Sequence, residues 1–536
     1  MQAEPFESLL RALSTSRLAP YHRDDDGGSE LTIYSRYLWN TALSESLYCV
    51  LQGLEVTLRN SIHDSITRYL GKERLGDYAT LLVIPVFIRL LNSFGLETLI
   101  NKKLPELNIK DPSGAQGRYL VGRLLILRFL TTIGFCALIY HFLSYYLDFI
   151  HNQWLMEFRW VLILYFIVIS VDSILSTLFM TLLRFKTLAK TEIFGALLNL
   201  FLLMLFISLD YEISGVLYAY IFSASVTSVI YLVLARDQYS GPTKKPEWDD
   251  MGHLAWVSYG ITFLGFGLLT QSDVLLLNYF KVSRADVGLY HLVTGLTGAM
   301  AFLLAGVAPM ALSLFSETYA KEGTMSLANL YCQIVGFASY LTIPVYVFCV
   351  LNSSHVINFI YGSAFSEGAG ALGIYATFAG IQNALGINFT VSSLYVIRRQ
   401  GVALRSTVEG SILNIGLNLV LIPAFGMMGA IIATGVVMVY MVLRQLKTIT
   451  AEMEIAPVFP VIGQCLLYCL IASIPCLILS WLNLGHLTIN LFLYLTALVA
   501  LLIWVKPFND EQRRLLINVY PRLDPWSKLF FRSSGS

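Results

Sequence analysis

The chain has 536 residues, of which 56% are hydrophobic and 13% are charged, and its mean hydropathy is +0.65. This composition excludes an ordinary soluble domain and indicates a protein that crosses a membrane many times. The 36 basic and 35 acidic residues nearly cancel, so the chain lacks the excess positive charge that would attract nucleic acid, and we expect no nucleic-acid partner.

The chain begins with a polar segment that has neither the basic start nor the apolar core of a signal peptide. Its clearest pattern is a series of aliphatic residues spaced three and four apart, which predicts an amphipathic helix that packs on a protein or lies on a membrane surface. The series is Leu47, Leu51, Leu54, Leu58, Ile62, Ile66 and Leu70. We expect no membrane span before residue 78.

Apolar stretches of about 20 residues follow and predict about thirteen membrane-spanning helices. They cover residues 78–98, 124–147, 160–183, 189–208, 214–235, 254–280, 287–314, 327–351, 369–394, 405–423, 425–445, 458–481 and 487–505. An odd number of spans places the two ends of the chain on opposite sides of the membrane.

Lysine and arginine residues gather in alternate connections between the spans. Basic connections lie around Lys102, Arg184, Arg236, Arg398 and Arg444, and the tail after residue 505 is also basic. Because such loops stay on the cytoplasmic side of a membrane, the pattern predicts a cytoplasmic C-terminus.

Ionisable and amide residues interrupt the spans at a few places. A charge inside hydrocarbon costs about 2.5–3.5 kcal/mol, so these side chains should face the interior of the helix bundle or a water-filled cavity. A second interpretation is that the asparagine, serine and threonine residues only join helices by hydrogen bonds. The candidates for a substrate or ion pathway are Asp172, Asp273, Asn278, Asn388, Asn414 and Asn418.

The apolar span that contains Asn414 and Asn418 is followed by residues that interrupt helices. In NIGLNLVLIPAFGMMGAIIATG, residues 414–435, two asparagines lie four residues apart and precede Pro423, Gly426 and Gly429. Residues four apart share one face of a helix, so both asparagines should point inward. The proline and the glycines predict a turn between two spans.

Two arginines, Arg123 and Arg128, lie near the predicted cytoplasmic end of their span. They are candidates for contacting an anionic group at the cytoplasmic mouth of a pathway. The alternative is that both only orient the span through the preference of basic residues for the cytoplasmic side. Arg128 is close enough to the end of the span for its side chain to reach the membrane surface.

The sequence contains no recognisable catalytic or nucleotide-binding motif. A Walker loop, an HExxH zinc motif and a GxSxG nucleophile motif are absent, and the cysteines lack metal-ligand spacing. We therefore expect neither an enzyme nor an ATP-driven pump, and we expect no cofactor and no metal.

Two stretches resemble the polysaccharide and O-antigen flippases, whose superfamily also contains the multidrug and toxin extruders and the lipid II flippases. LTQSDVLLLNYFKVSRADVGLYHLVTGLTGAMAFLLAGVAPMALSLFSETYAKEG, residues 269–323, is similar to the first two helices of that family's second lobe. NLVLIPAFGMMGAIIATG, residues 418–435, is similar to its hairpin of helices eleven and twelve. The resemblance runs from about residue 70 to the C-terminus.

The resemblance implies an all-α fold with two pseudo-symmetric bundles, two appended helices and a central cavity that opens alternately to each side. The thirteen spans then match family helices two to fourteen, and family helix one has no counterpart. The implied parts are a truncated first lobe at 72–240, a second lobe at 241–450, two appended helices at 451–505 and a cytoplasmic tail at 506–536. By pseudo-symmetry, the helix that carries Asp273 would line the cavity.

Residues 1–71 form a separate N-terminal part, which resembles the N-terminal half of Abi-like proteins of phage abortive infection. YLWNTALSESLY and LEVTLRNSIH carry the likeness. The related nucleases need four to six residues between an arginine and a histidine, whereas only three lie between Arg59 and His63. We interpret this helical segment as a fragment without nuclease activity.

The resemblance as a whole implies a flippase that moves an undecaprenyl-pyrophosphate-linked oligosaccharide across the bacterial inner membrane by alternating access, with transport impaired by the loss of helix one. Asp172 or Asp273 would couple transport to a proton or sodium gradient. A glycan polymerase and glycosyltransferases are the implied protein partners. The alternatives are a multidrug or cation antiporter of the same superfamily and a membrane-anchored Abi-like phage-defence protein.

Overall fold

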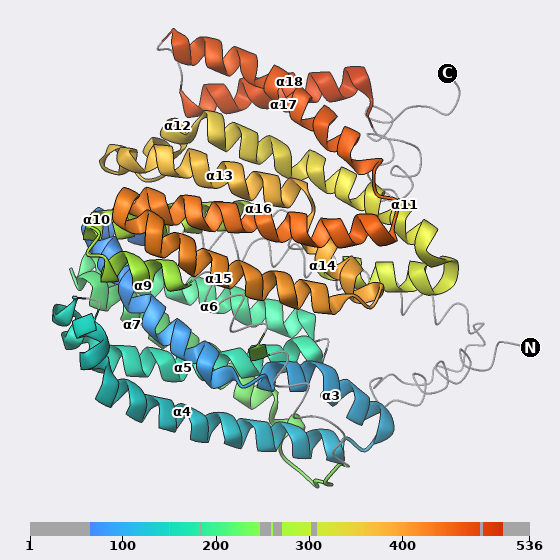
Figure 1. Ribbon diagram of the computed structural model, residues 1–536. Helices are drawn as coiled ribbons and strands as arrows, with labels where there is room; N and C mark the ends of the chain where they lie inside the picture. The colour runs from blue at the N-terminus through green and yellow to red at the C-terminus, as the bar shows by residue number, and fades with distance from the viewer. Residues whose placement is uncertain are drawn as a thin grey trace, which may run out of the picture. The chain divides into compact units, whose positions relative to one another are not determined.

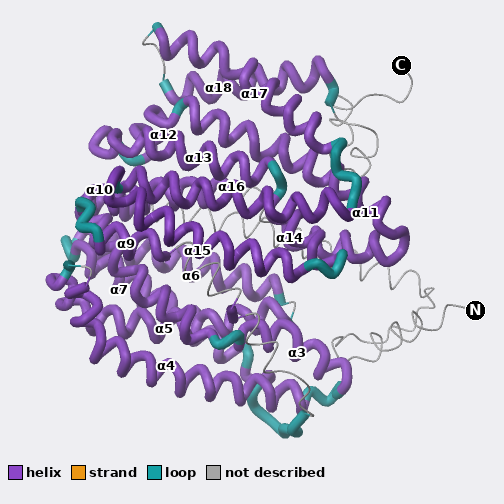
Figure 2. Tube along the Cα trace, viewed as in Figure 1, coloured by secondary structure: helices purple, strands orange, loops and turns teal. Residues whose placement is uncertain are grey.

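The computed structural model describes residues 65–149, 151–182, 184–246, 259–260, 271–301, 308–482 and 486–507. Within these ranges the chain folds into helices joined by loops, without a strand, as Figure 2 shows. The structure confirms the all-α class. The Abi-like segment, including Arg59 and His63, lies outside the described residues.

Ten helices in the described ranges are long and apolar enough to cross a membrane, and each coincides with a predicted span. They are Ser65–Ser93, Ala115–Phe149, Gln153–Thr181, Thr187–Ser208, Glu212–Leu234, Glu322–Leu351, Gln400–Phe425, Met427–Glu452, Val458–Trp481 and Leu487–Val505. The outward faces of these helices are apolar. For example, Trp481 is 83% exposed and Phe492 is 70% exposed. Such faces would aggregate in water, so they indicate surfaces that lie in lipid.

The other three predicted spans differ from these ten for two reasons. The spans predicted at 254–280 and 287–314 include residues that the structure does not describe. The span predicted at 369–394 is divided into α13 (Ala369–Ala384) and α14 (Ile387–Val396). Gly386 between them has a φ of 72°, in the left-handed region, which ends one helix and starts the next.

The first span is longer at its N-terminal side than the sequence predicted. The described helix already runs from Ser65 and ends at Ser93, where Phe94 and Gly95 both have positive φ. Charged residues in its first turns lower the local hydropathy, which is why the prediction began at residue 78. In the structure Lys72 pairs with Glu367 at 2.8 Å, and Asp77 pairs with Arg284 at 3.3 Å.

The described helices divide into two compact units. Among the described residues, unit 1 contains those of 65–69 and 80–260, and unit 2 contains those of 70–79 and 271–507. The helix Ser65–Ser93 therefore contributes to both units. The domain boundaries expected from the sequence, at 71, 240, 450 and 505, remain predictions.

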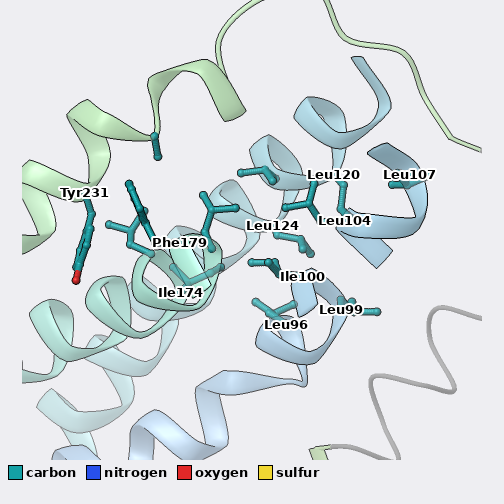
Figure 3. Packing of buried hydrophobic residues seen from close by; sticks show 14 of the residues in the cluster. Leu96, Leu99, Ile100, Leu104, Leu107, Leu120, Leu124, Ile174, Phe179 and Tyr231 are labelled. Carbon is teal, nitrogen blue, oxygen red and sulfur yellow. The ribbon is translucent and has the colours of Figure 1, made fainter. Parts of the chain in front are cut away.

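Unit 1 is built around a cluster of buried aliphatic and aromatic side chains. Figure 3 shows Leu96, Leu104, Leu124 and Phe179 among the side chains that converge in it. The helices of this unit, besides the helix Ser65–Ser93, are α3 (Leu96–Lys110), α4 (Ala115–Phe149), α5 (Arg159–Thr181), α6 (Phe185–Ser208) and α7 (Glu212–Leu234). The cluster draws its members from α3, α4, α5, α6 and α7 and from Ala235, so it holds the bundle together by burying apolar surface.

Unit 2 contains the remaining helices and the second large apolar cluster. Its helices are α9 (Ser272–Tyr279), α10 (Arg284–Ala301), α11 (Ala308–Leu351), α12 (Ser353–Ile360), α13, α14, α15 (Gln400–Phe425), α16 (Met427–Glu452), α17 (Val458–Trp481) and α18 (Leu487–Val505). The cluster includes Phe315, Tyr331 and Val442. A non-helical Gly323 kinks α11, and α17 and α18 lie side by side (Figure 1).

The hairpin of α15 and α16 has the turn that the sequence predicted. Gly426 lies between the two helices with a φ of 56°, and α15 carries Pro423 in its last turn. The two helices pack against each other (Figure 1), and Gly429 allows them to approach closely next to the turn. A Cβ atom on Gly429 would lie 2.2 Å from the carbonyl oxygen of Leu421, which is far inside van der Waals contact.

Replacing Gly429 by alanine is therefore expected to destabilise the hairpin by about 1–3 kcal/mol, the usual cost of overpacking. The measurement is the thermal stability of the detergent-solubilised protein, followed by size-exclusion chromatography. Gly416→Ala is the matched control in the same hairpin, since a Cβ atom there would meet nothing within 4 Å. Equal melting temperatures for the two variants would contradict the close packing.

Candidate functional site

A buried network of polar side chains surrounds Asp273 in unit 2. The Asp273 side chain is fully buried, and its Oδ1 atom accepts a hydrogen bond from Asn418 Nδ2 at 2.6 Å. Its Oδ2 atom accepts hydrogen bonds from the Thr434 hydroxyl at 2.5 Å and from the Tyr290 hydroxyl. Four helices, α9, α10, α15 and α16, thus each supply one member of the network.

Two further residues extend the network along α15 and α9. Asn418 Nδ2 also donates to Asn414 Oδ1 at 2.9 Å, and Asn414 Nδ2 donates to the Thr434 hydroxyl at 3.1 Å. The Ser272 hydroxyl donates to Asn414 Oδ1 at 3.4 Å. Asn414 and Asn418 are both fully buried, so the face that the four-residue spacing predicted points into the bundle.

The turn at Gly426 explains why the network forms. Asn418 lies eight residues before the turn and Thr434 lies eight residues after it, so an antiparallel hairpin brings the two side chains to the same depth. The sequence predicted the asparagines as candidates but not Thr434 or Tyr290. The symmetric spacing about Gly426 was the signal that could have identified Thr434, whereas nothing local in the sequence points to Tyr290.

The network can hold a charge away from water. A buried carboxylate is costly unless several donors satisfy it, and here three donors do so. Asn418 Oδ1, by contrast, is buried and has no hydrogen-bond partner among the described residues. This oxygen belongs to the same amide that donates to Asp273. It can therefore accept a hydrogen bond from a protonated Asp273, or bind a cation that sits beside the carboxylate.

The second predicted acid, Asp172, borders a pocket between α5, α6 and α7 in unit 1. The pocket encloses about 400 Å³ of empty space, including its open mouth. Asp172 Oδ1 accepts weak hydrogen bonds from Thr227 at 3.5 Å and Ser228 at 3.4 Å. Glu192, which the sequence pattern did not single out, also lines the pocket and accepts a hydrogen bond from Tyr231 at 2.7 Å. The lining therefore offers two carboxylates together with hydroxyl groups.

The predicted Arg128 is fully buried in unit 1 and does not reach the membrane surface. Its NH2 group forms an ion pair with Glu97 in the first turn of α3, and its NH1 group donates to the Asn92 carbonyl at 2.6 Å. Asn92 lies in the last turn of the helix Ser65–Ser93, so Arg128 connects the two sides of the break at Phe94 and Gly95. The interpretation of Arg128 as a side chain that extends to the interface is wrong, because a charged partner was available inside the bundle.

The remaining predicted residues lie apart from these groups. Asn278 is buried and donates to the Val274 carbonyl of its own helix at 2.7 Å. Asn388 is exposed on α14. Arg123 is exposed on α4, with its guanidinium carbon 5.3 Å from the centre of the Tyr119 ring. The structure thus brings three of the eight predicted residues, Asp273, Asn414 and Asn418, into one network.

Comparisons with known proteins agree on a family and on a fold. A family described as polysaccharide biosynthesis protein matches residues 66–369, more than half of the chain. The probable low-salt glycan biosynthesis flippase Agl15 of Haloferax volcanii is 24% identical over 219 residues, which cover 40% of this chain. The match covers 46% of Agl15, so the chain spans just under half the length of this curated relative.

Solved structures of two transporter types are similar in fold. An inward-facing multidrug resistance MATE family transporter of the MOP superfamily has a TM-score of 0.64 and 18% identity, covering 77% of this chain and 99% of the transporter. The lipid II flippase MurJ, in an inward closed conformation, has a TM-score of 0.65 and 14% identity, covering 85% of this chain and 97% of MurJ. At these identities the likeness shows that the fold is shared.

Proposed function

Because the chain belongs to the polysaccharide biosynthesis protein family, we propose that it is a flippase that moves a lipid-linked oligosaccharide across the membrane. The family match over residues 66–369 is the observation that carries the proposal. The likeness to Agl15 and to the fold of MurJ supports it. The substrate is an undecaprenyl-pyrophosphate-linked glycan, and the protein resides in the bacterial inner membrane with its C-terminus in the cytoplasm.

Transport by this protein proceeds by alternating access and draws its energy from an ion gradient. The Asp273 network is the proposed coupling site. A carboxylate that three donors satisfy can be ionised, and a proton on it would need an acceptor, which Asn418 can supply by turning its amide. A sodium ion would bind to the same oxygen atoms. Asp172 and its pocket are a second candidate for coupling.

The glycan itself needs hydrogen-bonding groups in place of water as it crosses. The Asp172 pocket presents carboxylate and hydroxyl groups from Glu192, Ser223 and Thr227 within the apolar spans. These groups match the hydroxyl groups of sugars, whereas the polyprenyl chain of the carrier stays in lipid. Glycosyltransferases that build the glycan and a polymerase that extends it are the proposed partners.

The proposal is tested by expressing the full chain in a bacterial strain that lacks its own glycan flippase. We expect lipid-linked glycan to stop accumulating in the cytoplasmic leaflet and glycan to reach the cell surface. Unchanged accumulation, at a normal amount of the protein in the membrane, would contradict the proposal.

The same strain tests the alternative functions. Export of cationic dyes and resistance to cationic drugs, without glycan export, would favour a multidrug antiporter, whose fold is shared. Toxicity that disappears when Arg59 and His63 are both replaced would favour the Abi-like phage-defence function.

A further inference from the structure

The Asp172 pocket of unit 1 lies on a helix hairpin that repeats the hairpin of the Asp273 network. Residues 195–199 read GALLN on α6, and residues 410–414 read GSILN on α15. After the turn, residues 215–219 read GVLYA on α7, and residues 429–433 read GAIIA on α16. The two pairs of helices are therefore related by an internal repeat.

The helices of the two hairpins also cross at equivalent points. A Cβ atom on Gly195 would lie 2.5 Å from the side chain of Thr227, and a Cβ atom on Gly410 would lie 2.9 Å from the side chain of Met441. Thr227 and Met441 occupy the same position relative to the glycine that follows the turn of their hairpin. The same faces of the paired helices therefore meet in both units.

The polar faces of the two hairpins have different neighbours. By the repeat, Asn199 of α6 is the counterpart of Asn414 of α15. In unit 2 Asn414 faces α9, whose Ser272 hydroxyl donates to it at 3.4 Å. In unit 1 Asn199 lines the pocket, whose described lining comes from α5, α6 and α7. The face that α9 covers in unit 2 is therefore open in unit 1, where it can receive a ligand.

The lining of the pocket combines acids with neutral polar groups. Asp172 and Glu192 supply two carboxyl groups, and the described lining includes no lysine or arginine. Asn199, Ser223 and Thr227 add an amide and two hydroxyl groups. Carboxylate oxygens only accept hydrogen bonds, so the complementary ligand is rich in donors and carries no negative charge.

The shape of the lining suits a single sugar unit. Tyr220 supplies an aromatic ring, against which the C–H face of a sugar can pack, and Gly195, Ala196 and Ala224 take little space beside it. The space of about 400 Å³ includes the open mouth, so the rest of an oligosaccharide would extend outside the pocket.

We infer that this pocket selects the glycan by charge: it accepts a neutral or amino sugar and rejects an acidic one. Like charges repel strongly in a site that holds little water, so a sugar carboxylate is disfavoured beside Asp172 and Glu192. A sugar ammonium group would pair with either carboxylate, and a sugar hydroxyl can donate to either. The inference rests on the proposed function, because it names the class of glycan that the flippase accepts.

The inference is tested with three synthetic undecaprenyl pyrophosphates, which carry glucose, glucosamine or glucuronic acid. The lipid and the pyrophosphate are the same in all three, so differences in Kd report the charge of the sugar. Native mass spectrometry of the purified full chain in detergent measures each Kd. We expect the Kd for the glucuronic acid compound to exceed that for the glucose compound by at least about tenfold, and the Kd for the glucosamine compound to be about threefold below it.

The double variant with Asp172→Asn and Glu192→Gln removes both charges and keeps the side-chain shapes, so its three Kd values should agree within about twofold. If this variant fails to fold, each single change should lower the ratio of the glucuronic acid Kd to the glucose Kd by at least about twofold. Glu157→Gln is the matched control. It removes a negative charge from an exposed position of η1 (Gln153–Phe158) in the same unit and should keep the wild-type ratio.

Three results would overturn the inference. The first is an equal Kd for the three compounds in the wild type, and the second is an unchanged ratio in the pocket variants. The third is a fall of the ratio in Glu157→Gln as large as in the pocket variants, because the selection would then come from the overall charge of the unit.

The failure of this inference can be told apart from the failure of the proposed function. If the wild type exports neutral and acidic glycans equally well, the flippase function stands and the selection by charge falls. If the wild type shows the expected order of Kd values, but exports no glycan, the selection by charge stands and the flippase function falls.

Discussion

Replacing Asp273 by asparagine is expected to lower glycan export by about 5- to 150-fold, the range that a coupling free energy of about 1–3 kcal/mol produces. Asparagine has nearly the same shape but cannot carry the charge that a proton or sodium ion would neutralise. The hydroxyl groups of Tyr290 and Thr434 can rotate to accept from the new amide, so we expect the fold to persist. The measurement is surface glycan in a flippase-deficient strain, at matched amounts of the protein in the membrane.

The control for this change is Asp286→Asn, the same substitution in the same unit. Asp286 lies in the first turn of α10, where it accepts a hydrogen bond from Ser283 at 2.8 Å outside the buried network. Its export should match that of the wild type. Varying external pH and sodium in the wild type identifies the coupling ion, and Asp273→Asn should lose that dependence. Export by Asp273→Asn at the wild-type rate would rule out coupling through Asp273.

Replacing Glu97 by leucine is expected to destabilise the protein by about 3–5 kcal/mol. The change leaves the Arg128 guanidinium, whose side chain is 2% exposed, without a counter-charge. It also frees the Ser173 hydroxyl that donates to Glu97. The break between the helix Ser65–Ser93 and α3 should open first, because Arg128 and Glu97 connect its two sides. Thermal unfolding of the detergent-solubilised protein measures the loss.

The double variant with Glu97→Leu and Arg128→Met should recover most of this stability, because replacing both partners of a buried ion pair by apolar groups is often neutral. The exposed pair of Arg399 and Glu452 offers a control, with side chains 56% and 38% exposed. Glu452→Leu should cost at most about 1 kcal/mol, the usual value of a surface pair. Equal losses of stability for Glu97→Leu and Glu452→Leu would show that the buried pair contributes no more to stability than the exposed pair.

Much of the fold follows from local composition. Runs of apolar residues predicted the positions of ten helices that the structure describes, because burial in lipid depends on the average hydropathy of each stretch. The positions where the prediction differs from the structure have other causes. Charged residues such as Lys72 and Asp77 concealed the start of the first helix, since their partners lie elsewhere in the chain. Gly386 divided a predicted span, because one residue with a positive φ is enough to end a helix.

The candidate sites were predictable only in part. The cost of placing Asp273, Asn414 and Asn418 in hydrocarbon is enough to identify them as candidates from their positions in the apolar stretches. The donors that complete the network were not predictable in the same way. Glu97 and Glu192 were missed because both lie near the end of a predicted span, where carboxylates are common.

The sequence by itself determined that the chain is a multi-span helical membrane protein, where most of its helices lie and which polar residues had to be turned away from lipid. Only the tertiary structure decided which partner each of these residues has. Asp273 lies 145 residues from Asn418 and 161 from Thr434, and Glu97 lies 31 residues from Arg128. Hydropathy is a property of each stretch of chain, whereas hydrogen bonds and ion pairs depend on which helices pack against each other.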